Sequence, residues 1–309
     1  MTDLAQDPLE DLPEYRSLKS DVWRQFRRHK GAMFGLFVLT IIVLAVIVGP
    51  EIYPYAPKGS DAEDLSRRLQ GSSWRHPMGT DNLGRDALAR ILVGGRVSIA
   101  VGFTAMLVGL VIGTLIGVLA GFFKILDGPL MRFTDLFLSL PLLPLLLVIM
   151  VLWRDSLKER FGPSLGIFIL VVFVIGITSW MQTARVVRGD VLAVKEEEFV
   201  LAARSVGTPA RRIVARHILP NVLSPVIVAA SLGVATAIIT ESALSFLSLG
   251  FPADFPTWGR LLFDAKDRLT TNPVLTIWPG VMISVTVMAV TLIGDGLRDA
   301  LDPKLRSKG

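Results

Sequence analysis

Long stretches without any charged residue are the feature that most constrains this chain. Six runs contain no Asp, Glu, Lys, Arg or His: 31–50, 97–123, 136–153, 161–184, 218–240 and 269–294. A hydrocarbon core about 30 Å thick is crossed by roughly 20 apolar residues in helical conformation, so each run can span a bilayer. The sequence therefore predicts an all-α polytopic membrane protein with six transmembrane helices.

The composition agrees with this class and excludes others. Hydrophobic residues make up 51% of the 309 residues and charged residues only 19%, which is below the roughly 25% of soluble domains. The absence of cysteine rules out disulfides, zinc-thiolate sites and thiol catalysis. The net charge of +5 is not gathered in a basic stripe with aromatic residues, so we predict no nucleic-acid partner.

The positive charges predict the orientation of the first span. Arg24, Arg27, Arg28 and Lys30 lie at its start, whereas the next basic residue after it is Lys58. Because Lys and Arg are retained on the cytoplasmic side, we expect both termini to be cytoplasmic. The predicted segments are a tail and helix at 1–30, spans at 31–50, 97–123, 136–153, 161–184, 221–240 and 269–294, outer segments at 51–96 and 241–268, a cytoplasmic loop at 185–220 and a cytoplasmic tail at 295–309.

The predicted spans contain nothing that could drive transport. Secondary carriers usually bind a coupling ion through ionisable side chains at membrane depth, and the six runs have none. The chain also lacks a G-x-x-x-x-G-K-[ST] loop for ATP phosphates, and no cluster of His, Asp or Ser indicates a membrane enzyme. Active transport would therefore need ATP hydrolysis by another subunit. The alternative is a self-contained channel or secondary carrier.

Small residues recur at every fourth position of the second span. Ala105, Gly109, Gly113, Gly117 and Gly121 share one helical stripe, along which another helix can approach closely. The sequence leaves open whether this stripe packs within the subunit, forms a subunit interface or lines a pathway.

Two other stretches carry local signals. Pro141 and Pro144 lack amide donors, so we expect the third span to bend or to enter the membrane irregularly. In the outer segment, Asp81 and Asp86 are expected to cap helix starts. We expect the nearby Arg85 and Arg90 to be solvated.

The loop 185–220 predicts a two-helix elbow that projects from the membrane. Gly207 can end one helix, and Pro209 suits the first turn of the next. Ala202, Ala203 and Val206 are expected to form a small apolar face beside several arginines. Such a face suits docking in a groove of another protein.

This elbow resembles the EAA loop of ABC-importer permeases, whose pattern is E-A-A-x3-G-x9-I-x-L-P. Ala202, Ala203, Gly207, Leu219 and Pro220 fall on the pattern at the right spacing. Two positions depart from it, because Leu201 and His217 stand where the family has Glu and Ile; Glu198, about one turn before Leu201, is a candidate replacement for the glutamate. The resemblance implies ATPase docking through Glu198, Ala202, Ala203, Gly207, Thr208, Pro209, Arg211 and Arg212.

Further stretches resemble the dipeptide/oligopeptide/nickel group of these permeases. They are HPMGTDNLGRDALARILVGGRVSIAVG at 76–102, ESALSFLSLGFPADFPTWG at 241–259 and GDGLRDALDPKLR at 294–306. The segment SDVWRQFRRHKGAMFG at 20–35 is similar to the basic N-terminal helix of the "C" member of the paired B and C permeases.

The resemblance implies a type I ABC importer of the bacterial inner membrane. It implies a paired homologous permease, two ATPase subunits that hold ATP and Mg, and a periplasmic solute-binding protein that docks on 51–96 and 241–268. The chain itself would be no enzyme and would hold no cofactor or metal. The implied cargo is a dipeptide, an oligopeptide, nickel or another small solute, moved into the cytoplasm by alternating access.

Overall fold

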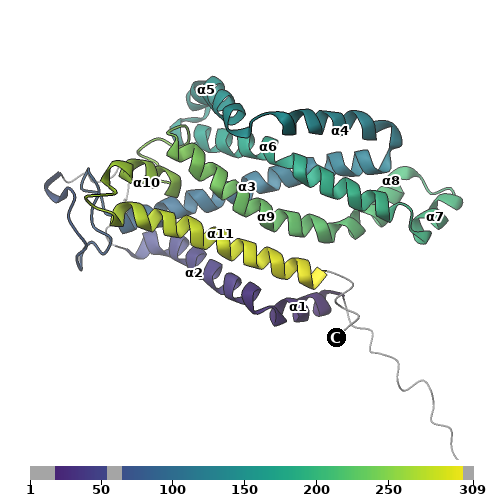
Figure 1. Ribbon diagram of the computed structural model, residues 1–309, viewed down its shortest axis with the longest axis horizontal. Helices are drawn as coiled ribbons and strands as arrows, with labels where there is room; N and C mark the ends of the chain where they lie inside the picture. The colour runs from purple at the N-terminus through teal and green to yellow at the C-terminus, as the bar shows by residue number, and fades with distance from the viewer. Residues whose placement is uncertain (1–17, 54–64, 302–309) are drawn as a thin grey trace, which may run out of the picture.

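The structure is a computed structural model that describes residues 18–53 and 65–301, and long helices dominate it. They lie side by side in an elongated bundle (Figure 1). The elements are α1 (Leu18–Arg28), α2 (Lys30–Ile52), the 3-10 turn η1 (Leu65–Arg67), α3 (Ala87–Phe122), α4 (Lys124–Ser139), α5 (Leu142–Phe161), α6 (Pro163–Val194), α7 (Glu198–Ser205), α8 (Ala210–Ile213), the π turn η2 (Val214–Ile218), α9 (Leu219–Phe246), α10 (Trp258–Ala265), the 3-10 turn η3 (Lys266–Arg268) and α11 (Val274–Leu301).

The predicted all-α membrane fold is confirmed. Within the described residues, five helical segments are long and apolar enough to cross a bilayer: α2, α3, α6, the run from α8 through α9, and α11. The pair α4 and α5 passes the same test together but is bent by 89°. The segments number six if this bent pair is one span.

The predicted third span at 136–153 covers a corner rather than one straight helix. Helix α4 ends at Ser139, and α5 begins at Leu142 with Pro141 as its N-cap. Proline has no N–H to donate and disfavours helical geometry in the residue before it; Leu140 accordingly has an extended ψ of 137°. The bend expected from the prolines is therefore present, and it divides the run.

Most of the other helices extend beyond the uncharged runs that predicted them. Helix α3 begins at Ala87 and includes Arg90 and Arg96, and α6 continues past Arg188 to Val194. Arg96 is satisfied by neighbouring groups, since its Nε donates to the Val46 carbonyl at 2.7 Å. A charged residue therefore marks the end of an uncharged run in the sequence, but the helix can continue past it. The predicted tail 295–309 continues α11 as far as Leu301, and its remaining residues lie outside the described part.

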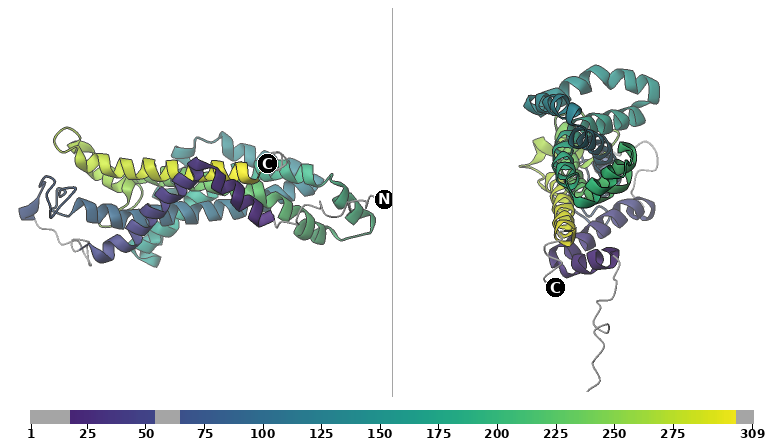
Figure 2. Two further views of the ribbon diagram at one scale, coloured as in Figure 1. Left: turned by 90° about the horizontal axis from the view of Figure 1, so that it is seen from below. Right: turned by 90° about the vertical axis from the view of Figure 1, so that its right-hand side faces the viewer.

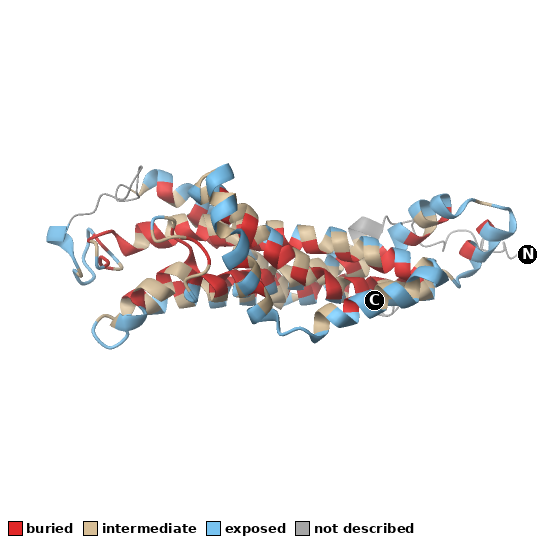
Figure 3. Ribbon diagram, turned by 90° about the horizontal axis from the view of Figure 1, so that it is seen from above, coloured by how far each residue is buried: buried red, intermediate tan, exposed pale blue. Residues whose placement is uncertain are grey.

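The small-residue stripe of α3 packs against α6 of the same subunit. A β-carbon added at Gly113 would lie 2.6 Å from the Trp180 carbonyl oxygen, and one at Gly117 would lie 2.7 Å from that of Ala184. Added β-carbons at Gly109 and Gly121 would meet α6 in the same way, and Ala105 is fully buried. Figure 3 shows buried residues along the inside of the bundle, and many apolar residues on the outside of the long helices are exposed.

Candidate functional site

The elbow predicted at 185–220 is built on a helix-ending turn at Gly207. Gly207 has a φ of +74°, the left-handed region that favours glycine. Its N–H donates to the Arg204 carbonyl at 2.9 Å, and the Thr208 N–H donates to the Ala203 carbonyl at 3.1 Å. These two bonds form a Schellman motif, which ends α7, and α8 then starts after Pro209. The structure thus contains two short helices joined at Gly207-Thr208-Pro209.

The elbow is held to the bundle by an apolar cluster. Val200 and Ala203 of α7 and Ile213 of α8 are buried together with Val187 and Val191 of α6. The same cluster includes Ile218, Val222 and Val226 at the start of α9. The elbow is therefore packed onto the ends of α6 and α9 and projects beyond the end of α11 (Figure 1).

The outer side of the elbow contains most of the residues predicted for docking. Val206 is 81% exposed at its tip. Glu198, Ala202, Gly207, Pro209, Arg211 and Arg212 are exposed, and Thr208 is half-buried. Ala203 differs from the expected apolar face, because it points into the bundle and is only 9% exposed. A sequence pattern identifies one side of a helix without saying which side its neighbours cover.

Two contacts connect the elbow region to the end of α3. The Lys195 ammonium donates to the Gly121 carbonyl at 3.1 Å, and the Arg204 guanidinium lies 5.4 Å from the centroid of the Phe122 ring. Helix α9 follows α8 through the π turn η2, where the Asn221 amide donates to the His217 carbonyl at 2.7 Å. The elbow thus touches α3, α6 and α9.

Ion pairs between α4 and α6 were not foreseen from the sequence. Arg188 forms a bidentate ion pair with Asp127, in which Nη2 donates to Oδ2 at 2.7 Å. Arg185 forms a second ion pair with Asp135. The partners are 50 and 61 positions apart in the sequence, so only the tertiary fold brings them together.

A large open cleft lies beside the elbow end of the bundle. Its volume is about 1190 Å³, and its walls come from the α4–α5 corner, α6, α9 and the end of α11. Its polar lining includes Thr178, Ser179, Gln182, Thr183, Asp190, Asn221, Ser224, Thr236, Thr240 and Arg298. Most of the other lining residues are apolar, and among the polar groups hydroxyls and amides predominate, with Asp190 near the end of α6 and Arg298 near the end of α11.

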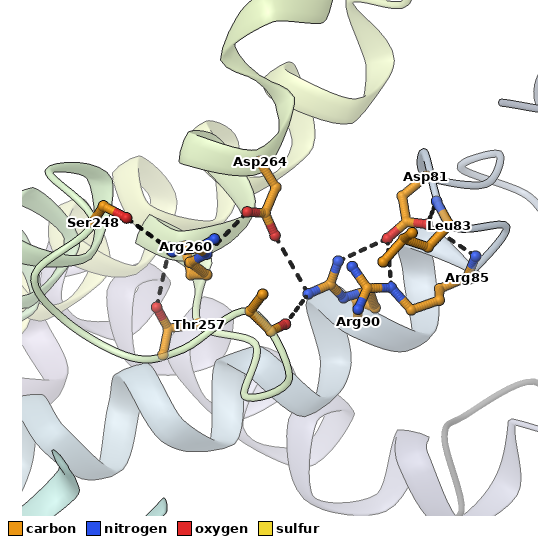
Figure 4. Close-up of polar contacts among 9 residues, drawn as sticks. Asp81, Leu83, Arg85, Arg90, Ser248, Thr257, Arg260 and Asp264 are labelled. Carbon is orange, nitrogen blue, oxygen red and sulfur yellow. Dashed lines mark hydrogen bonds and ion pairs between the residues drawn. The ribbon is translucent and has the colours of Figure 1, made fainter. Parts of the chain in front are cut away.

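A buried charge network joins the loop before α3 to α10 and to the loop before α10, at the end of the bundle away from the elbow (Figure 4). Arg90 is 1% exposed, and its guanidinium donates to Asp81 at 2.7 Å and to the Ala253 carbonyl at 3.0 Å. It also lies 3.5 Å from Asp264, which pairs with Arg260 at 2.9 Å. Arg90 therefore connects the loop before α3 with α10 and with the loop that precedes it.

The expected solvation of Arg85 and Arg90 is wrong. Arg85 is 6% exposed and donates to Asp81 at 2.8 Å. Burial alone would raise the pKa of Asp81, but the Arg90 and Arg85 cations outweigh it and leave this pKa below its ordinary value. Asp81 thus stabilises the fold at neutral pH, and this contribution is lost only as the pH falls through the lowered pKa. Asp86 caps α3 as expected, accepting from the Ala89 N–H at 2.7 Å.

A second buried polar group lies nearby, at the outer end of α9. Glu241 is fully buried and accepts from Ser98 of α3 at 3.1 Å and from Ser245 at 2.7 Å. Ser98 in turn accepts from the Trp258 N–H at 3.2 Å. Glu241 therefore ties α3, α9 and α10 together. Glu241 is the first residue after the uncharged run 218–240. This position was the only hint in the sequence that the glutamate lies at the end of a membrane-spanning segment.

Comparisons of the sequence identify the family. Residues 109–307 match the family described as binding-protein-dependent transport system inner membrane component. Residues 17–71 match the N-terminal TM domain of oligopeptide transport permease C. The first match alone covers more than half of the chain.

Curated relatives are similar over nearly the whole length. The chain is 37% identical to the dipeptide transport system permease protein DppC of Alkalihalophilus pseudofirmus, over 98% of this chain and 97% of that protein. It is 37% identical to the oligopeptide transport system permease protein OppC of Haemophilus influenzae, over 97% and 93%. It is 38% identical to the glutathione transport system permease protein GsiD of Pectobacterium atrosepticum, over 93% and 91%.

A solved structure shares the fold. A chain of the MetNI methionine ABC transporter in an inward-facing conformation superposes with a TM-score of 0.53 at 18% identity, covering 68% of this chain and 94% of that one. The membrane-spanning helices, the elbow and these matches lead to one conclusion: the chain belongs to the inner membrane components of binding-protein-dependent transport systems, the permease subunits of ABC importers.

Proposed function

We propose that this chain forms half of a peptide-import pathway and is moved by ATPase subunits that dock on its cytoplasmic elbow. A paired homologous permease would face the open cleft and complete the pathway. ATP and Mg would be held by the ATPases. Both chain termini would be cytoplasmic, with the outer segments in the periplasm.

The observation that carries this proposal is the double attachment of the elbow. Its inner side is buried against α6 and α9, and these two helices also form walls of the cleft. A force applied to the exposed side of α7 and α8 is therefore applied to the cleft walls. This arrangement suits a switch between two discrete conformations, in which closure of the ATPases changes the side to which the cleft opens.

The lining of the cleft favours a peptide as cargo. Its hydroxyl and amide side chains can exchange hydrogen bonds with peptide groups without demanding a particular side chain. The relatives are named for dipeptides, oligopeptides and glutathione, which share amide bonds. Nickel is less suited, because the lining includes a single carboxylate and no histidine.

The buried outer network suits the docking of a periplasmic solute-binding protein. Arg90 joins the loop before α3 to the loop before α10, so the two outer segments present one connected surface. Trp74 is fully exposed on this side. Exposed aromatic residues are common anchors in protein interfaces.

Co-purification tests the elbow assignment. Val206→Asp puts a charge at the exposed tip, where docking would bury it, and should reduce the recovery of ATPase subunits by about tenfold or more. The matched control Trp74→Asp makes the same change at the opposite end and should leave ATPase recovery unchanged. Equal recovery with Val206→Asp would contradict docking at the elbow. ATP-independent uptake by the isolated chain would instead favour a channel or secondary carrier.

The turn at Gly207 provides a second test. Gly207→Val places a β-branched residue at a φ of +74°, which costs roughly 1–2 kcal/mol in backbone strain. No atom lies within 4 Å of the added β-carbon, so the effect is conformational rather than a clash. We expect normal membrane insertion but ATP hydrolysis uncoupled from uptake in reconstituted vesicles. Gly207→Asn, which tolerates this conformation, should retain coupling; wild-type uptake by the valine variant would argue against the turn's role.

A further inference from the structure

Helix α1 has an apolar side that is packed and a basic side that is not. Val22 and Phe26 belong to a cluster with Ala300 of α11, and Phe26 is only 5% exposed. At helical spacing, Arg24 and Arg28 fall on the opposite side of α1. Trp23 lies at the boundary between the two sides, half-exposed and stacked on Phe26 at 5.9 Å.

The exposed side of this helix is strongly cationic. Arg24, Arg27, Arg28 and Lys30 are all exposed. Asp21 offsets one of these charges by pairing with Arg24 at 3.1 Å. The Arg27 guanidinium lies 5.2 Å from the Trp23 ring centroid, which leaves its charge at the surface. The acid that faces this region from α11, Asp299, lies 3.5 Å from His29.

The position of α1 is set by the membrane helix that follows it. Helix α1 ends at Arg28, and the candidate span α2 begins at Lys30 with His29 as its N-cap. The chain bends between the two helices (Figure 2). A helix attached to the very start of a span lies at headgroup depth, where tryptophan is enriched and basic side chains reach lipid phosphates.

We propose that the basic side of α1 binds the headgroups of anionic phospholipids. Each Lys or Arg near an anionic membrane surface contributes roughly a fivefold gain in affinity, so the cluster Arg24, Arg27, Arg28 and Lys30 suffices for selective binding. This site differs from the elbow, whose helices α7 and α8 lie beyond the end of α11, away from α1 (Figure 1). It bears on transport because α1 packs on the last turns of α11, and Arg298 and Leu301 of those turns line the cleft.

Quenching of Trp23 by brominated lipid tests this site without any transport assay. The full chain is placed in phosphatidylcholine nanodiscs with equal added amounts of brominated phosphatidylglycerol or brominated phosphatidylcholine. The chain has six tryptophans, so a Trp23→Phe variant isolates the Trp23 signal by difference. We expect stronger quenching by the phosphatidylglycerol, and the preference should weaken as salt screens the charges.

Two arginine variants complete the test. Arg27→Gln with Arg28→Gln should reduce the preference for phosphatidylglycerol on the order of tenfold. Arg27→Lys with Arg28→Lys keeps the charges and should keep the preference. As the control, Lys158→Gln with Arg160→Gln removes two cations at the opposite end of the bundle and should change nothing. Equal quenching by both lipids, or a preference that survives the Gln variant, would overturn the proposal, as would loss of preference in the Lys variant.

Discussion

Replacing Arg90 with leucine should lower the free energy of unfolding by about 3 kcal/mol or more, because removing one member of a buried ion network leaves its partners uncompensated. Asp81 and Asp264 would both lose a cation, and the Ala253 carbonyl would lose its donor. Arg85 and Arg260 would remain beside the two aspartates, which keeps the expected loss near the lower end of the range for buried pairs.

Thermal unfolding of the purified chain in detergent measures this effect. Arg90→Lys should be intermediate, since a lysine retains the charge but cannot bond to several acceptors at fixed angles. Arg160→Leu, an exposed arginine at the same end, should change stability by no more than about 0.5 kcal/mol. An unfolding midpoint for Arg90→Leu equal to that of Arg160→Leu would mean that the network does not stabilise the outer end.

Gly113→Leu should be the other strongly destabilising change, at about 3 kcal/mol or more. Even a β-carbon would lie 2.6 Å from the Trp180 carbonyl oxygen and 2.6 Å from the Thr183 β-carbon, so α3 and α6 would have to move apart. Overpacking of this kind commonly costs 1–3 kcal/mol, and here a whole helix pair resists the adjustment. We expect loss of the monodisperse peak in size-exclusion chromatography and a lower unfolding midpoint.

Gly189→Leu is the matched control on the partner helix. No atom lies within 4 Å of a β-carbon added there, and leucine favours helix over glycine, so this variant should be neutral or slightly more stable. If Gly113→Leu and Gly189→Leu had the same effect on stability, the small-residue stripe would not be needed for the close approach of α3 and α6.

The sequence predicted the spanning segments because hydrocarbon thickness sets their length. The helices extend beyond the uncharged runs because a charged residue such as Arg96 can remain helical once neighbouring groups satisfy it. The third span kept its expected bend, which is 89° between α4 and α5.

The candidate site was predictable in part. The turn at Gly207 depends on local backbone chemistry, so the spacing of Gly207 and Pro209 was sufficient to predict it. Other features depend on which helices are neighbours in the fold. They are the burial of Ala203, the cleft, the α4–α6 ion pairs and the burial of Arg90. Arg90 illustrates this most clearly, because its acceptor at Ala253 lies 163 residues further along the chain. A local pattern cannot show such a partner.

That separation has a consequence for biogenesis. During synthesis the ribosome delivers α3 and its Arg90 long before α10 emerges, and four long helical segments are made in the interval. Until then Arg90 has Asp81 as a neighbour but lacks Ala253 and Asp264. The network around Arg90 is therefore completed only after α10 has been made, and a nascent chain truncated before Trp258 would leave this end of the bundle without the contacts that close it.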